Sequence, residues 1–186
     1  MTDDLLAAGC HDRRLDVLER QLDDLIADPR AIAQLGPEEV AELNGRAPEL
    51  KEACRRLAAC GLPETLVHGD LHPGNVARQD GELVYFDWTD ACVAHPLFDL
   101  HTLQWERDEE DRSALLDAYL AVWDGIVPPD RLREAAALAA VVTPLHHAVS
   151  YQHIVAGLEP TSKLELDATH RFLREALGKL RSLVDM

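Results

Sequence analysis

One short segment constrains this chain more than any other, the octapeptide His68-Gly69-Asp70-Leu71-His72-Pro73-Gly74-Asn75, which has the pattern H-G-D-x-x-x-x-N. Pro73-Gly74 predicts a tight loop, and the strand pattern of residues 65–68 leads into it. Asp80-Gly81 then separates two further strand patterns, 75–78 and 82–87, and predicts a β-hairpin turn. This is the only β-rich region that the sequence indicates, so the remaining chain has to fold around one loop and one hairpin.

The rest of the chain has helical periodicity. Leu15, Leu18, Leu22 and Leu25 recur at three- and four-residue steps, which predicts an amphipathic helix that ends before Pro29. Further helical patterns span about 37–43, 48–60, 97–105, 109–123, 128–157 and 162–184. Pro144 is expected to bend or break the fifth of these, and Ser162 with Glu165 predicts a capping box for the last. We therefore predict one α+β, mostly helical domain.

Charge and cysteine usage limit the function classes. Lys and Arg number 18 against 34 Asp and Glu, a formal net charge of -16, which disfavours nucleic acid and anionic membranes as partners and attracts cationic small molecules. No segment has the length of a membrane span or the pattern of a signal peptide. The four cysteines fit no zinc template. We expect a cytoplasmic protein with reduced thiols.

The octapeptide and the hairpin end carry residues suited to phosphoryl transfer. That reaction needs positioning, a group that orients the attacking hydroxyl, and cations that neutralise the phosphates. Magnesium prefers hard oxygen ligands and takes one or two from the protein. Asp70 and Asn75 on one loop, with Asp87 at the end of the adjacent hairpin, supply one orienting carboxylate and two magnesium ligands.

These residues also carry a family resemblance. Residues 66–75 and 84–88, Val84-Tyr85-Phe86-Asp87-Trp88, closely resemble the aminoglycoside phosphotransferase and choline kinase superfamily of protein-kinase-like small-molecule kinases. The resemblance implies that Asp70 is the catalytic base, and that Asn75 and Asp87 bind magnesium. It makes His68 a structural residue of the loop, and Asp99 in His95-Pro96-Leu97-Phe98-Asp99-Leu100 an acceptor of backbone N–H groups that braces the loop.

The implied fold is a kinase-like C-terminal lobe with a small catalytic hairpin. Its parts would be N-terminal helices over 1–62, the catalytic loop and hairpin over 63–92, and a helical substrate-side subdomain over 93–186. ATP or another nucleoside triphosphate would be the phosphoryl donor, with Mg²⁺ as the metal ion. The acceptor would be a hydroxyl of a small molecule, and the net negative charge of the chain favours a cationic one. Family members phosphorylate aminoglycosides, choline or ethanolamine, and other metabolites.

Several further residues have two interpretations. His72 either hydrogen-bonds within the loop or faces the substrate, and Asp90 is either a turn residue or part of the pocket. Trp88 is either core or a platform for a cationic amine. His146, His147 and Tyr151 fall in one helical stretch. A metal site is disfavoured there because no nearby carboxylate completes a metal template, so these residues either pack in the helix or line the acceptor pocket.

The nucleotide-binding half of such kinases has no counterpart in the sequence. Apart from the short strand pattern that leads into the loop, the segment before the octapeptide has only helical patterns, with no Gly-rich strand–turn–strand and no lysine before Lys51. We therefore expect an isolated C-terminal lobe, from an incomplete gene product or a natural half-protein, with weak or absent kinase activity. An apolar face near the loop is expected to pack on the missing lobe, a second chain or another copy in a homodimer. The alternative is a non-catalytic, pseudokinase-like binding or regulatory module.

Overall fold

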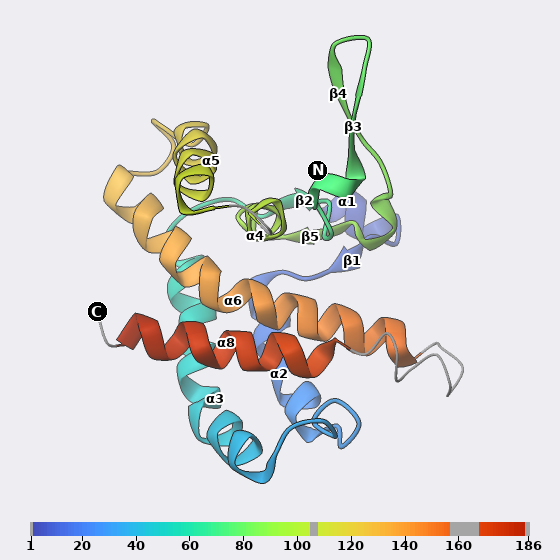
Figure 1. Ribbon diagram of the computed structural model, residues 1–186, viewed down its shortest axis with the longest axis vertical. Coiled ribbons are helices and arrows are strands. Elements are labelled where there is room, and N and C mark those ends of the chain that lie inside the picture. The colour runs from blue at the N-terminus through green and yellow to red at the C-terminus, as the bar shows by residue number, and fades with distance from the viewer. Residues whose placement is uncertain (1, 105–107, 157–167, 185–186) are drawn as a thin grey trace. The chain divides into compact units, whose positions relative to one another are not determined.

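The computed structural model describes residues 2–104, 108–156 and 168–184, which are mostly helical with two small sheets (Figure 1). The residues group into two compact units. The first comprises Met1–Arg14 and Cys60–Ala136, and the second Leu15–Ala59 and Ala137–Met186. The division of a single domain into segments 1–62, 63–92 and 93–186 stays a prediction.

The first unit contains a three-stranded sheet of very short strands. β5 (Cys92–Ala94) lies between β1 (His11–Asp12), with which it is parallel, and β2 (Thr65–Val67), with which it is antiparallel. All three residues of β5 are buried, and α1 (Thr2–Ala7) contacts β2 and β5. The sequence did not indicate β1 or β5, because strands of two or three residues show no periodicity, and it did not indicate the six-residue α1.

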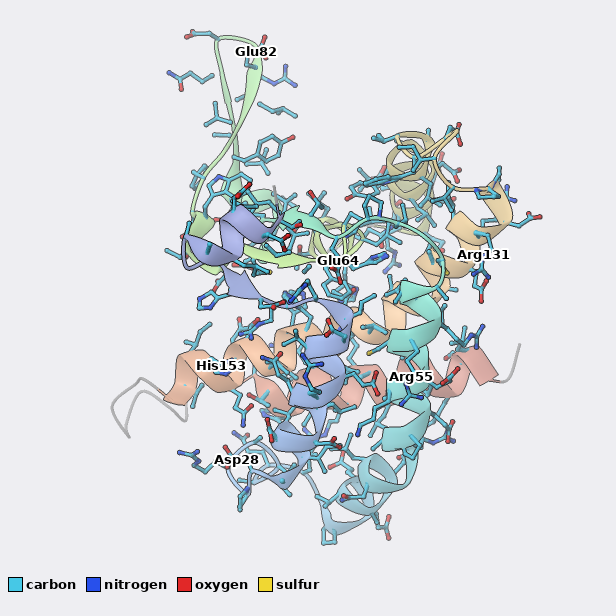
Figure 2. The ribbon with its side chains drawn as sticks, turned by 180° about the vertical axis from the view of Figure 1, so that it is seen from behind. Asp28, Arg55, Glu64, Glu82, Arg131 and His153 are labelled. Carbon is cyan, nitrogen blue, oxygen red and sulfur yellow. The ribbon has the colours of Figure 1, made fainter. Side chains whose placement is uncertain are left out.

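The second sheet is the predicted hairpin. The 3₁₀ turn η1 (Pro73–Asn75) ends the loop, and β3 (Val76–Gln79) pairs with β4 (Glu82–Tyr85) in an antiparallel register. Gly81 at the turn has φ 90°, a left-handed conformation that glycine adopts without a steric penalty. The hairpin projects from the first unit, with Glu82 near its tip (Figure 2). A second 3₁₀ turn, η2 (Trp88–Asp90), follows it.

Two further helices of the first unit follow β5 in the chain. α4 (Phe98–Leu103) follows β5 and contacts α5 (Glu109–Ala121). α5 starts at a capped residue, since the Asp108 carboxylate accepts the Asp111 N–H at 2.9 Å. The long helix α6 (Pro129–Ala156) begins in this unit and continues in the second.

The second unit is a helical assembly with a leucine-rich core. α2 (Leu15–Ala27) buries the four predicted leucines against α3 (Pro37–Ala58), which confirms the amphipathic pattern. α8 (Thr169–Val184) packs on α3, where two arginine–glutamate pairs join the helices: Arg174 with Glu39 and Arg181 with Glu42. The predicted capping box at Ser162 lies outside the described residues.

The expectation that a separate helix starts at Pro48 was wrong, and so was one of the two alternatives for Pro144, a break of the helix. The patterns 37–43 and 48–60 form one helix, α3, that continues through Pro48, and α6 is not broken at Pro144. A proline inside a helix removes one backbone hydrogen bond. Buried leucines lie on both sides of Pro48, at Leu43 and Leu50. The burial of this continuous apolar face outweighs the local cost.

Candidate active site

The backbone of the loop that carries Asp70 is hydrogen-bonded to one carboxylate, that of Asp99. Asp99, in the first turn of α4, accepts the backbone N–H of His68 at 2.8 Å and that of Gly69 at 2.9 Å. Burial raises the pKa of Asp99, and the two N–H groups oppose that shift because they stabilise the ionised form. The Asp99 side chain therefore fixes the backbone immediately before Asp70.

His68 joins the same loop to the end of the hairpin. Its side chain is buried, and its Nε2 lies 2.9 Å from the carbonyl oxygen of Phe86, the residue before Asp87. Nε2 donates this bond, because a carbonyl oxygen can only accept. The imidazole also lies against the indole of Trp88, with ring centroids 4.7 Å apart. This contact joins the segment that precedes Asp70 to the segment that precedes Asp87.

Asn75 is tied directly to the residue whose carboxylate it would assist. Its side chain is buried, and its Nδ2 donates to the backbone carbonyl of Asp70 at 3.0 Å. The backbone carbonyl of Asn75 accepts the Phe86 N–H at 3.2 Å. The hydrogen bond from Nδ2 to the Asp70 carbonyl fixes the orientation of the side-chain amide. The amide oxygen, Oδ1, is a hard oxygen of the kind that Mg²⁺ selects.

Asp87 occupies an unusual backbone conformation at the end of the hairpin. It has φ 62° and ψ 60°, the left-handed region, which Asp tolerates better than most residues. Thr89 donates its hydroxyl to Asp87 Oδ1 at 2.7 Å, and the residue is exposed. Its other carboxylate oxygen, Oδ2, is a hard oxygen of the class that Mg²⁺ prefers, and a role for Asp87 as a magnesium ligand stays a prediction. Asp70, Asn75 and Asp87 are thus presented by one hydrogen-bonded element.

Asp90 makes a close contact with Gly69 that the sequence does not reveal. Gly69 has φ 85°, and a Cβ at this position would overlap the carbonyl oxygen of Asp90. The close approach brings Asp90 beside the loop, and its pKa is raised by burial and then by the charges of Asp70 and Asp87. Asp90 therefore lies close enough to Asp70 and to Asp87 for both charges to act on it, although the described residues contain no cluster of three or more His, Cys, Asp or Glu side chains that could hold a metal ion.

His72 and Trp88 lie at the edge of this constellation. His72 Nδ1 accepts the Gly74 N–H at 3.0 Å and caps η1, while its Nε2 lies 3.7 Å from Asp70 Oδ2. Trp88 is 47% exposed and donates its Nε1–H to the Tyr85 carbonyl at 3.1 Å. The interpretation of Trp88 as core is therefore wrong; the residue presents an exposed aromatic surface beside the loop.

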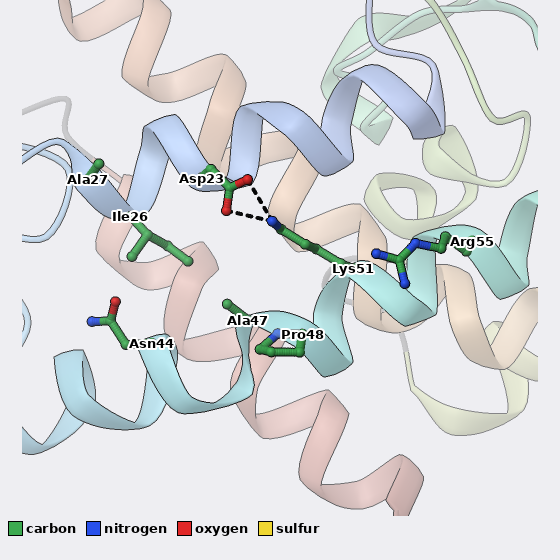
Figure 3. A pocket seen from close by; sticks show the side chains of 8 residues that line it. All are labelled: Asp23, Ile26, Ala27, Asn44, Ala47, Pro48, Lys51 and Arg55. Atoms are coloured by element: carbon green, nitrogen blue, oxygen red, sulfur yellow. Dashed lines mark hydrogen bonds and ion pairs between the residues drawn. The ribbon is translucent and has the colours of Figure 1, made fainter.

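The remaining candidates belong to the second unit. His146 and His147 are buried in α6, and both His147 and Tyr151 stack on Phe172 of α8, with ring centroids 5.0 and 5.3 Å apart. The second unit also has a surface groove of about 600 Å³ between α2 and α3 (Figure 3). Lys51 pairs with Asp23 at 2.6 Å across this groove. A role in the acceptor pocket stays a prediction for His146, His147 and Tyr151.

A family model described as the phosphotransferase enzyme family matches residues 5–138, more than half of the chain. The match spans the loop, the hairpin, α4 and α5. No curated protein and no solved structure has a significant match to the chain. In the part of the chain that the structure describes, no helix is both long and apolar enough to cross a membrane.

Proposed function

The chain belongs to the phosphotransferase enzyme family, and on that premise we propose that it carries the acceptor and magnesium half of an ATP-dependent kinase for a small-molecule hydroxyl. The observation that carries the proposal is the tie between Asn75 and Asp70 within a loop anchored by Asp99. Preorganisation of this kind is what phosphoryl transfer needs from a protein.

Each residue has a role in this proposal. Asp70 accepts a hydrogen bond from the acceptor hydroxyl and orients its oxygen towards the γ-phosphate. It takes the proton as the new P–O bond forms and the bond from the γ-phosphorus to the bridging oxygen breaks, which releases ADP. Asn75 and Asp87 hold magnesium, which when bound neutralises charge on the phosphates. His72, which lies beside the Asp70 carboxylate, and the exposed face of Trp88 would contact the acceptor.

The hairpin is proposed to be covered in the active enzyme. Leu83, Tyr85 and Phe86 are 53%, 44% and 44% exposed, an unusual concentration of apolar surface for a free protein. A kinase-like C-terminal lobe would place a nucleotide-binding lobe over this hairpin, supplied by further sequence, a second chain or another copy. We therefore expect weak phosphoryl transfer by this chain alone.

The test is transfer of labelled γ-phosphate from Mg²⁺–ATP to a panel of cationic and neutral hydroxyl compounds. Weak transfer is expected from the chain, and none from Asp70→Asn. The matched control is Asp80→Asn, the same substitution at the exposed hairpin turn. Calorimetry with Mg²⁺–ATP accompanies the assay. Absence of both transfer and binding would favour a non-catalytic binding module over a kinase.

A further inference from the structure

The loop is braced by Asp99, and Asp99 itself sits on a helix too short to be stable alone. α4 has six residues, and an isolated helix of this length is not formed in water. Its place is therefore fixed by neighbouring groups. Leu97 and Phe98 are buried at its start, but apolar contacts are not directional and do not by themselves set the orientation of a carboxylate.

A directional contact comes from α5. The Tyr119 hydroxyl donates a hydrogen bond of 2.6 Å to the carbonyl oxygen of Pro96, in the connection between β5 and α4. Burial raises the pKa of Tyr119 to about 12, followed by the charge of Asp99, so the hydroxyl remains a donor at neutral pH. The hydroxyl thus holds the backbone three residues before Asp99.

We propose that Tyr119 is a positioning residue for the catalytic loop, acting through Pro96 and Asp99 on the backbone of His68 and Gly69. The link between these contacts runs along the backbone from Pro96 to Asp99. Tyr119 bonds to Pro96, the Phe98 N–H bonds to the His95 carbonyl at 3.1 Å, and Asp99 bonds to the loop. The inference rests on the proposed function only for its effect on catalysis.

A simpler role has to be distinguished from this one. A buried tyrosine hydroxyl needs an acceptor wherever it lies, so the bond could serve only the stability of α5. That role predicts that loss of the hydroxyl weakens the whole protein evenly. A positioning role predicts a local effect, concentrated at the two amides that Asp99 holds.

The experiment is amide hydrogen exchange by NMR on the full chain, comparing the unmodified protein, Tyr119→Phe and the control Tyr85→Phe, which loses a hydroxyl from the exposed hairpin. In Tyr119→Phe we expect the His68 and Gly69 amides to exchange about 3- to 10-fold faster, the range that one lost hydrogen bond gives. The Phe86 amide, bonded to Asn75, should keep its rate. Tyr85→Phe should change none of the three.

Uniform acceleration, unchanged rates at His68 and Gly69, or a Tyr119→Phe protein that does not fold would each overturn the proposal. Where the chain transfers phosphate, Tyr119→Phe should lower kcat about 3- to 10-fold with KM for both substrates unchanged, because orientation rather than binding is altered. A chain with no transfer would count against the kinase function alone, since the exchange rates still decide the role of Tyr119.

Discussion

The side-chain amide of Asn75 donates a hydrogen bond to the backbone carbonyl of Asp70, across five residues of one loop. The bond uses the nitrogen of the amide and orients the oxygen. A residue that only closed the loop could equally be a donor of another type, whereas a side chain that donates through a nitrogen and also presents a separate carbonyl oxygen is found in Asn and Gln. The sequence motif therefore has a structural reason in addition to a chemical one.

Asn75→Asp tests this bond. The substitution keeps the shape of the side chain but places a carboxylate oxygen against the Asp70 carbonyl, in a buried position. We expect a loss of about 2–3 kcal/mol in the free energy of unfolding at neutral pH, measured with urea. The control is Asn44→Asp, because Asn44 Nδ2 also donates to a backbone carbonyl, that of Val40, but at an exposed site; its loss should stay below about 1 kcal/mol. Equal losses at the two sites would contradict the interpretation.

The approach of Asp90 to Gly69 gives a second prediction. Gly69→Ala combines a left-handed φ with an overlap between the new Cβ and the Asp90 carbonyl, whereas Gly81→Ala has a similar φ and open space around the Cβ. Gly81→Ala should cost about 1 kcal/mol for backbone strain, and Gly69→Ala about 1–3 kcal/mol more for the overlap. Thermal and urea unfolding measure both. A Gly69 variant no less stable than the Gly81 variant would mean that the loop can move away from Asp90 without penalty.

The sequence was sufficient for the parts of the fold that have a local signal. The leucines of α2 have a helical period, and Asp80-Gly81 marks the hairpin turn. β5 gives no such signal, because its three residues are identified only by their partners on β1 and β2. Pro48 gives a misleading one, because the energy that keeps α3 intact comes from tertiary burial.

The same limit applies to the site. The residue types and spacing of Asp70, Asn75 and Asp87 are enough to indicate their chemistry. The contact of Gly69 with Asp90 joins positions 21 residues apart, and the bond between Tyr119 and Pro96 joins positions 23 apart. Neither pair has a motif, so only the packed chain shows that they meet.

Acid should destabilise the protein through His95. This residue is buried at the end of β5, its Nδ1 accepts the Leu97 N–H at 3.4 Å, and burial lowers its pKa from 6.5 to about 4. The unfolded chain binds a proton as the pH falls below about 6.5, while the folded chain stays neutral until about 4, so stability decreases across this window. The decrease is on the order of 3 kcal/mol at most.

His95→Asn should flatten that part of the pH dependence, since Asn retains an acceptor for Leu97 without titrating. His11→Asn, at an exposed strand residue, should leave it unchanged. Urea unfolding between pH 7 and 5 avoids Asp28 and Glu39, because their pKa values are lowered to about 2 and their stabilising ionised form is lost only at lower pH. Asp90 and Asp99 have raised pKa values and contribute in the opposite direction, but they are present in both proteins, so the difference between the two profiles reports His95. A His95→Asn profile parallel to that of the unmodified protein would exclude His95 as the cause.

The exposed hairpin should make the isolated chain self-associate. Among the described residues β4 pairs with β3 alone, so it is an edge strand. It carries the exposed side chains of Leu83 and Tyr85, and exposed apolar edge strands promote pairing between chains. Sedimentation velocity should show a weight-average coefficient that rises with concentration, and Leu83→Lys should reduce that rise. Val122→Lys adds the same charge at a valine that is 72% exposed at the end of α5, and should leave the rise in place. If both variants reduce it equally, net charge and not the hairpin controls association. If the coefficient of the unmodified chain is independent of concentration, the apolar hairpin surface is insufficient to hold two copies together.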